Sequence, residues 1–219
     1  MSRIKYFAAL TVITQAMLSQ TALAGSVDGP SAAPVPAGAY TVDKAHTSLI
    51  FRVSHLGFST YTGRFTRVDA QLQFNPDDIG ASRVTVNIDP RSIEADNAPS
   101  GFIQALAGKD WLDADRFNEL SFRSTGVEVT GPQTFRISGQ LTLHGVTRSI
   151  ALEARYNGGY AGHPYEPKAR VGFSAQGSFK RSDFGVNYGV PAPGTTLGVG
   201  DTVNVVLETE FSGPPLAQN

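Results

Sequence analysis

The sequence predicts an all-β fold built from an antiparallel sheet of about eight strands. From Tyr40 onward, segment after segment alternates apolar and polar residues with period 2, as strands with one buried face do. Only one stretch, near residues 100–116, has helical spacing instead. Strands with one apolar face must pack in two layers or close on themselves to avoid open edges. The periodicity therefore indicates a sandwich or a barrel and does not choose between them.

Eight segments carry the alternation, and their apolar faces are unusually aromatic. The segments are residues 49–55, 68–74, 83–89, 120–124, 135–143, 150–156, 170–180 and 203–211. Phenylalanine recurs on these faces, at Phe51, Phe74, Phe122, Phe135, Phe173, Phe179 and Phe211. We therefore expect an interior rich in phenyl rings, whichever way the sheet closes.

A tight turn is expected between two of these strands, at His144 and Gly145. The apolar residues are odd-numbered before the turn, as at Leu143, and even-numbered after it, as at Ile150. Such a change of phase is expected when a tight turn joins the two strands of one hairpin. We therefore interpret His144 as a turn residue and not as a ligand.

The helical stretch is expected to begin after Ser100, a plausible N-cap, and to end at Gly108. Three aspartates follow it and resemble part of a calcium-binding loop. The glycine-centred loop and the terminal glutamate of such a site are missing, so we interpret the three as a solvated acidic turn. They are Asp110, Asp113 and Asp115.

His55 falls on the apolar face of its strand, where an imidazole is unexpected. Leu49, Phe51 and Val53 precede it on the same face. One interpretation is a core imidazole that bonds backbone carbonyls or a neighbouring hydroxyl. Another is a polar contact for a molecule bound inside the fold. A metal-binding or acid–base role is the third alternative, and the sequence leaves all three open.

No recognisable catalytic or metal-binding motif accompanies this histidine. His46 and His55 are nine residues apart, so a regular strand would send them to opposite faces. The sequence has no H-E-x-x-H, G-x-S-x-G or phosphate-binding glycine loop. Arg181 and Asp183 are expected to form a structural ion pair. The alternative is that Arg181 holds an anionic head group at a pocket mouth. No catalytic residue and no metal site are predicted.

The start of the chain resembles a secretory signal peptide. It has basic residues, an apolar run too short to span a bilayer, and the small-x-small pattern Ala-Leu-Ala that ends at Ala24. Cleavage is expected after Ala24, and the periplasm is the predicted location. The chain is thus expected to comprise a signal peptide (1–24), a flexible lead-in (25–39) and one domain (40–213).

Charge and cysteine content narrow the range of partners. The net charge is −1 and there is no long basic run, so nucleic acid and anionic membrane surfaces are not expected as bulk partners. The sequence contains no cysteine, which excludes disulfides and thiolate metal sites. A core of packed side chains must therefore hold the fold together.

Three segments in order resemble the signature segments of the YceI-like, polyisoprenoid-binding family. They are YTVDKAHTSLIFRVSHLG, SGQLTLHGVTRSIAL and GFSAQGSFKRSDFGV, and the resemblance extends over about residues 40–211. It implies a lipocalin-like antiparallel barrel with a short helical insertion near residues 100–116. It also implies an elongated apolar channel that holds a polyisoprenoid chain. Such a resemblance favours the barrel over the sandwich.

The chain departs from the family pattern in three places. Its helical region has no histidine and carries Trp111 in the aromatic position, so the resemblance implies no head-group contact from a histidine there. The usual His-Ser is His46-Thr47, which keeps a hydroxyl. A long loop at residues 185–201 is expected to alter the channel mouth.

The resemblance and the apolar faces together predict a non-enzymatic carrier of a polyprenyl phosphate or an isoprenoid quinone. No cofactor is expected apart from this bound isoprenoid lipid. Further expected partners are membranes or membrane quinone proteins in transient contact, and the sequence leaves a homodimer open. Two alternatives are an enzyme that uses His55 and Asp183 on a lipid, and an envelope stress protein whose barrel its own side chains fill. The predicted ligand-binding residues are Leu49, Phe51, Val53, His55, Phe74, Trp111, Phe122, Phe135, Leu143, Phe173, Phe179, Arg181 and Phe211.

Overall fold

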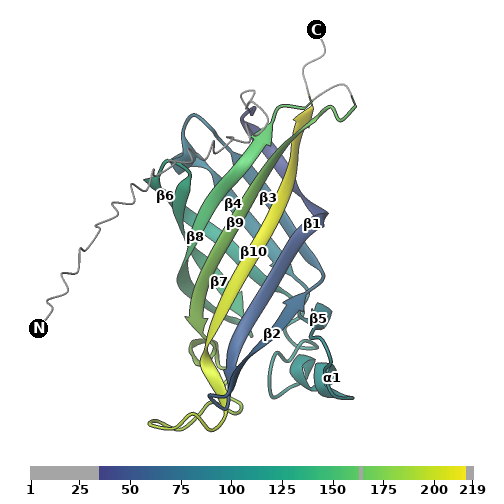
Figure 1. Cartoon of the computed structure of the whole chain (residues 1–219), viewed down its shortest axis with the longest axis vertical. Helices are drawn as coiled ribbons and strands as arrows, with labels where there is room; N and C mark the ends of the chain where they lie inside the picture. Colours follow the sequence, from purple (N-terminus) through teal and green to yellow (C-terminus); the bar gives the residue numbers. More distant parts are fainter. Residues whose placement is uncertain (1–34, 163–164, 216–219) are drawn as a thin grey trace, which may run out of the picture.

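The computed structural model describes residues 35–162 and 165–215, which form a closed antiparallel barrel (Figure 1). The predicted all-β barrel of about eight strands is therefore confirmed. The strands are β1 (Gly38–His55), β2 (Ser59–Phe65), β3 (Val68–Phe74), β4 (Arg83–Ile88), β5 (Ile93–Glu94), β6 (Leu120–Gly131), β7 (Thr134–Leu143), β8 (Val146–Tyr160), β9 (Lys168–Lys180) and β10 (Val199–Pro215). The short helices are η1 (Ile79–Ala81), η2 (Pro90–Ser92), α1 (Phe102–Ala107) and η3 (Arg181–Phe184).

The ring closes because β1 and β10, near opposite ends of the chain, pair with each other. Around the ring, β1 is followed by β3, β4, β6, β7, β8, β9 and β10. The strand β2 continues the line of β3 along the second half of β1, and β5 in turn pairs with β2. The ten segments thus occupy eight positions around the barrel.

A register shift in β1 reverses which residues face inward. Tyr40 and Val42 are buried in the first part of the strand, whereas Leu49 and Val53 are buried in the second. The pairing with β10 is irregular between Asp43 and Ser48, where β1 advances five residues and β10 only two, so three extra residues lie in β1 there. The shift lets one long strand present apolar side chains to the interior along its whole length.

The turn between β7 and β8 has the predicted form. Leu143 pairs with Val146, which leaves His144 and Gly145 as a two-residue loop. Both loop residues have positive φ, 52° and 72°, as a type I′ turn requires. The ring of His144 packs against Phe117, with 4.6 Å between centroids. The histidine is therefore a turn residue, as the phase change indicated.

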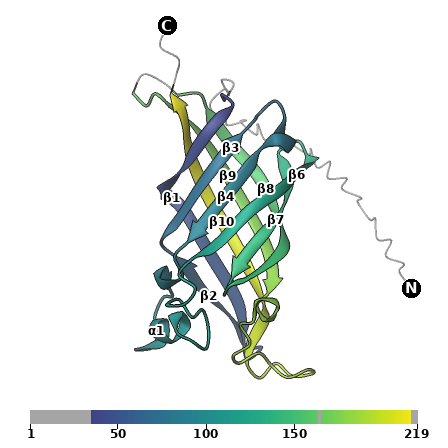
Figure 2. The same ribbon diagram turned by 180° about the vertical axis from the view of Figure 1, so that it is seen from behind.

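The helix α1 begins later than expected. Gly101, in a left-handed conformation, is the N-cap residue, and no side chain caps the helix. The expectation that Ser100 caps it is therefore wrong, whereas the predicted end at Gly108 is confirmed. The segment around α1 lies between β5 and β6, beside the short β2–β5 pair (Figures 1 and 2). It covers the outer edge of β5, which pairs with no strand but β2 among the described residues.

One half of the barrel interior is filled with side chains. This packed half contains Tyr40, Phe74, Val171 and Phe211, and the rings of Tyr156 and Phe173 pack against them. Phe173 contacts the rings of Phe74, Tyr156 and Phe211 with 5.5 to 6.2 Å between centroids. The strand ends at this half are those where β1 begins and β10 ends, opposite α1 (Figure 1).

The last residues of the predicted lead-in, 35–39, belong to the folded domain. Val35 is buried in the packed half, and β1 begins at Gly38, before the expected boundary at residue 40. The predicted signal peptide, residues 1–24, and residues 25–34 lie outside the described residues. Within the part that is described, no helix is long and apolar enough to cross a membrane.

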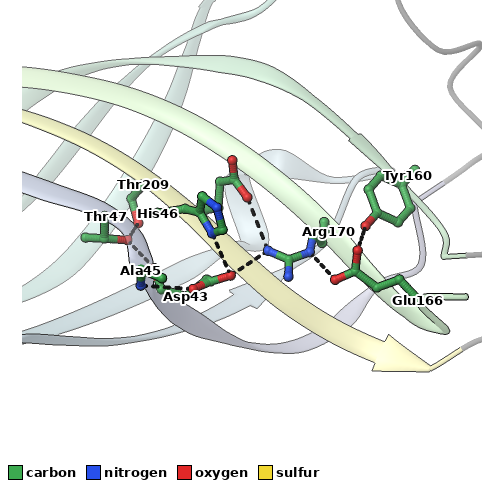
Figure 3. A network of polar contacts seen from close by, with 9 residues as sticks. Asp43, Ala45, His46, Thr47, Tyr160, Glu166, Arg170 and Thr209 are labelled. Atoms are coloured by element: carbon green, nitrogen blue, oxygen red, sulfur yellow. Dashed lines mark hydrogen bonds and ion pairs between the residues drawn. The ribbon is translucent and has the colours of Figure 1, made fainter.

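A polar network on the outer surface ties β1, β9 and β10 together near the packed half (Figure 3). Arg170 of β9 donates to Asp43 of β1 at 2.6 Å and to Glu210 of β10 at 3.2 Å. The same guanidinium pairs with Glu166, and His46 contacts the carboxylate of Asp43 at 3.0 Å. The arginine and histidine hold the pKa of Asp43 at about 2, below its ordinary value of 3.8.

Candidate functional site

The other half of the barrel contains a cavity of about 410 Å³ at the end that carries α1. Side chains from the barrel wall, from α1 and from the loops at this end line it. They are Leu49, Phe51, Val53, His55, Tyr61, Phe65, Val86, Ile88, Ile93, Pro99, Phe102, Leu106, Trp111, Leu112, Leu120, Phe122, Leu141, Leu143, Ile150, Leu152, Phe179, Arg181, Val186, Val199, Val203, Val205 and Leu207. Nearly all are apolar, and the size is typical of a small-molecule site.

Glycines in the wall help to keep this half hollow. Phe51 of β1 lies directly opposite Gly63 of β2, and a methyl group at Gly63 would overlap the Phe51 ring. The Phe122 ring of β6 occupies the space that a side chain at Gly139 of β7 would need. Both rings therefore lie flat over the neighbouring strand and do not project across the interior.

Residues of α1 form part of the cavity wall. Phe102 and Leu106, four residues apart, place their side chains on its lining because they share one face of the helix. The ring of Phe102 packs edge-on against Tyr61 of β2, with 5.7 Å between centroids. Sequence reasoning predicted the helix but not its role as part of the cavity wall.

Nine of the predicted ligand-binding residues lie on this cavity, and four do not. Those on the lining are Leu49, Phe51, Val53, His55, Trp111, Phe122, Leu143, Phe179 and Arg181. Phe74, Phe173 and Phe211 belong to the packed half, and Phe135 is buried away from the lining. The cavity therefore occupies only part of the barrel interior, because rings of the packed half fill the remainder.

His55 lies at the open end of the cavity. It is the last residue of β1, is exposed, and pairs with Ser59 and Val199 of the adjacent strands. Its ring has no hydrogen bond to any side chain or backbone group in the described part of the chain. The interpretation as a satisfied core imidazole is therefore wrong, and the position fits a polar contact at the mouth.

Arg181 is buried in the wall near the mouth, and its bonding differs from the prediction. The residue is 4% exposed, and among the described residues its guanidinium has no ion pair with Asp183. Four guanidinium hydrogens donate to backbone carbonyls, those of Val186, Tyr188, Val199 and Gly200, at 2.7 to 3.0 Å. The predicted ion pair is thus wrong, because Arg181 instead connects both ends of the loop at residues 186–200 to η3, directly after β9.

The charge of Arg181 has no carboxylate in direct contact. Burial lowers its pKa from the ordinary value, although the charge of Asp201 acts in the opposite direction. The guanidinium also lies over the Trp111 ring, 5.1 Å from its centroid. A guanidinium has five hydrogens, so one N–H of Arg181 has no hydrogen-bond partner among the described groups.

Tyr61 is a lining residue that sequence reasoning missed. Its hydroxyl is buried and has no hydrogen-bond partner in the described structure, although such groups are usually satisfied. Burial raises the pKa of Tyr61, so the hydroxyl stays protonated and can donate. Tyr61 lies in the segment Ser-Thr-Tyr-Thr-Gly, in which apolar and polar residues hardly alternate. Its place on the cavity lining could therefore be inferred only from its pairing with Val53.

The described residues contain one group of potential metal ligands, and it lies outside the cavity. It consists of Asp43, His46 and Glu210 of the polar network. Arg170 already donates to both carboxylates, so a cation occupies the oxygens that a metal ion would need. The arrangement fits an ion-pair network better than a metal site. The aspartates after α1 form no such group.

Comparison with known proteins agrees with this architecture. A family model described as the YceI-like domain matches residues 40–211. A UPF0312 protein of Vibrio cholerae serotype O1 is 34% identical over 171 residues, which cover 77% of this chain and 87% of that protein. The match extends over most of both chains.

Two solved structures share the fold. BcnA of Burkholderia cenocepacia matches with a TM-score of 0.66 and 22% identity, covering 77% of this chain and 98% of that one. A domain from Saccharophagus degradans, described as polyisoprenoid-binding, matches with a TM-score of 0.57 and 17% identity, covering 80% and 98%. The resemblance found in the three sequence segments is confirmed, and the chain belongs to the YceI-like family.

Proposed function

We propose that this protein is a non-enzymatic carrier that binds the tail of an isoprenoid lipid in the cavity beside α1. The observation that carries the proposal is the cavity with an almost wholly apolar wall, open at the end near α1. The description of the Saccharophagus degradans domain as polyisoprenoid-binding supports the same ligand class. The lipid is a polyprenyl phosphate or an isoprenoid quinone, both of which join a branched apolar tail to a head group with acceptor oxygens.

The tail supplies most of the binding free energy. Burial of apolar groups contributes about 0.8 kcal/mol per CH₂, so each five-carbon unit contributes on the order of 3 kcal/mol before the cost of ordering the chain. One hydrogen bond to a head group contributes about 1 to 3 kcal/mol. A few isoprene units therefore outweigh any single polar contact in this wall.

The polar atoms near the mouth select the head group. The Tyr61 hydroxyl and the fifth N–H of Arg181 are donors without partners among the described residues, and both residues line the cavity. An acceptor oxygen of a quinone or a phosphate satisfies such donors once a side-chain rotation brings them to the cavity surface, because the polar atoms are buried behind the apolar lining in this structure. His55, at the rim, offers a further polar contact.

The geometry gives less support to an enzyme. His55 lines the cavity, whereas the exposed carboxylate of Asp183 is not on the lining, so the two groups proposed for catalysis are not assembled there. The alternative of a barrel filled by its own side chains fits only the packed half. Loss of turnover in His55→Ala with binding intact would favour the enzyme.

We further propose that the chain is exported to the periplasm and loses residues 1–24. The motif at Ala24 supports this location. A carrier there exchanges its lipid with membranes or with membrane quinone proteins in transient contacts. We also propose a homodimer, in which a second copy at the mouth would shield a protruding tail.

Lipid extraction tests the proposal. Mass spectrometry of the gently purified protein is expected to show unchanged prenyl lipid. Val205→Trp fills the hollow from a lining position and is expected to abolish the bound lipid. Asn204→Trp, at the adjacent outward position, is the matched control and is expected to retain it. No lipid in the wild type, together with no uptake of added prenyl lipids, would refute the carrier.

A further inference from the structure

The loops around the cavity mouth expose large apolar side chains to solvent. Phe58 is 84% exposed in the turn between β1 and β2, and Leu197 is 73% exposed in the loop before β10. Tyr188 of the same loop is 58% exposed. The two loops touch, because the Leu56 amide donates to the Gly198 carbonyl at 2.8 Å. Neighbouring exposed apolar side chains of this size often mark an interaction site.

The same two loops carry no permanently charged side chain. Residues 55–63 and residues 185–200 have no Asp, Glu, Lys or Arg. Loops at the packed end differ, since Asp77, Asp78 and Lys168 lie there. Moving a charged side chain into an apolar phase is expensive, so these two loops are the part of the mouth that enters such a phase at the lowest cost. The segment around α1 at the same end carries exposed charges such as Lys109 and Asp110 and is expected to stay in water.

This exposed rim is continuous with the cavity wall. Val186 and Val199 flank the loop that carries Tyr188 and Leu197, and both line the cavity. The ring of Tyr188 packs on Trp111, another lining residue, with 5.4 Å between centroids. The 185–198 loop and α1 lie at the same end of the barrel in both views (Figures 1 and 2). Apolar side chains therefore connect this loop with the cavity lining through Tyr188 and Trp111.

We propose that Phe58, Leu197 and Tyr188 insert into the surface of a lipid bilayer and bring the cavity mouth against the membrane. The proposal rests on the proposed function, since a carrier must take its lipid from a bilayer. Protruding tips without charges suit an apolar phase, and tyrosine suits the boundary between lipid and water. A tail then passes from bilayer to cavity along apolar surface.

Vesicle co-sedimentation tests the docking. The probe is neutral phosphatidylcholine vesicles that contain no isoprenoid. The wild type is expected to pellet with them equally at low and high salt, because the rim carries no fixed charge. Phe58→Ser and Leu197→Ser each remove one inserted side chain and are expected to lower the partition coefficient roughly tenfold or more.

Val129→Ser is the matched control. Val129 is 58% exposed, as Tyr188 is, but it lies in β6 near the opposite end of the barrel. It is expected to pellet like the wild type. The proposal would be overturned if the Phe58→Ser/Leu197→Ser double variant pelleted with the vesicles as much as the wild type does. Binding that requires anionic lipid and disappears in high salt would overturn it too, as would wild type that remains in the supernatant.

Uptake of a prenyl lipid from detergent separates this failure from failure of the carrier. Neither Phe58 nor Leu197 lines the cavity, so the double variant is expected to take up lipid from detergent like the wild type. Normal uptake without vesicle binding in the wild type would refute the docking alone. Vesicle binding through the rim without any uptake would refute the carrier and leave the docking supported.

Discussion

The ring of Phe51 lies over the bare backbone of Gly63, its direct partner on the neighbouring strand. The absence of a side chain at Gly63 lets the ring lie against the wall. The nearest ring, that of Phe65, is 5.6 Å away between centroids and also lines the cavity. A phenylalanine can thus coat the hollow without filling it.

Gly63→Ala is expected to push the Phe51 ring into the cavity. A methyl group at residue 63 overlaps that ring, and such overpacking costs about 1 to 3 kcal/mol. Binding of a prenyl lipid should weaken together with the free energy of unfolding, measured by urea titration. Gly126→Ala is the control, because a Cβ there meets no atom within 4 Å.

A double-mutant cycle makes this test specific. Phe51→Leu removes the overlapping ring, so the double variant Phe51→Leu/Gly63→Ala should be more stable than the sum of the two single changes predicts. Additive effects would contradict the proposed contact between ring and glycine.

Affinity should rise with tail length only until the tail reaches the closed end of the cavity, its floor, at the packed half. The lining on β1 runs from Leu49 to His55, which at about 3.3 Å per residue and a tilt of about 40° spans roughly 15 Å along the axis. An extended isoprene unit of four bonds, each about 1.5 Å, is about 5 Å long. Affinity, measured by competition, should therefore rise to about three units and then level.

Phe173→Ala tests the floor directly. Phe173 is an inward residue of β9 beyond the cavity and belongs to the packed half. Its removal opens space there, so the plateau should move to longer tails. Phe135→Ala is the control, because Phe135 is buried away from both the lining and the ring cluster. An unchanged plateau in Phe173→Ala would mean that another group ends the hollow.

Alternation predicted most of the barrel because each strand has one buried face. It identified the inward set that includes Leu49, Phe122 and Phe179, which the structure places on the cavity. It could not separate these from Phe74 and Phe173, because inward parity is the same in the packed half and in the hollow half. What distinguishes the halves is which residues meet across the barrel, and that depends on closure.

The bonding of Arg181 and Tyr61 was unpredictable for a related reason. Spacing in RSDFG suggested a local ion pair, whereas the carbonyls that bind Arg181 come from the far ends of a long loop. The β2 strand that carries Tyr61 has little alternation, and its position depends on β1. The opposite parity of Val42 and Leu49 is a sequence signal that could have indicated the register shift in β1.

Tyr61→Phe should affect stability and selectivity in opposite directions. The buried hydroxyl has no partner in the described structure, and such a group costs about 1 to 3 kcal/mol. The lipid-free variant should therefore be more stable than the wild type in urea unfolding. Affinity should fall several-fold for a prenyl quinone but stay the same for a prenyl hydrocarbon of equal length.

Tyr188→Phe, which alters an exposed hydroxyl, is the control and should leave both ligands unaffected. Equal losses for the quinone and the hydrocarbon in Tyr61→Phe would show that the hydroxyl makes no contact with a head group.

Acid should destabilise the barrel partly through Asp43. Its pKa is about 2 in the folded chain, mainly because Arg170 donates to its carboxylate, against 3.8 ordinarily. The unfolded chain therefore binds this proton first as the pH falls. The contribution to stability is complete above about pH 4 and is lost as the pH falls towards 2. With the side chain 18% exposed, we expect about 1 to 2 kcal/mol after solvent screening.

Asp43→Asn should lower the free energy of unfolding at pH 7 by this amount and flatten its pH dependence between pH 4 and 2. Asp69→Asn removes an exposed pair with Lys44 and should change stability by less than about 0.5 kcal/mol. Urea unfolding of both variants across this range gives the comparison. In Asp43→Asn, Arg170 keeps its ion pairs with Glu166 and Glu210. A loss of stability well above the expected value would therefore mean that the three strands separate without Asp43. Parallel pH curves for the wild type and Asp43→Asn would instead show that the carboxylate is not stabilised by the network.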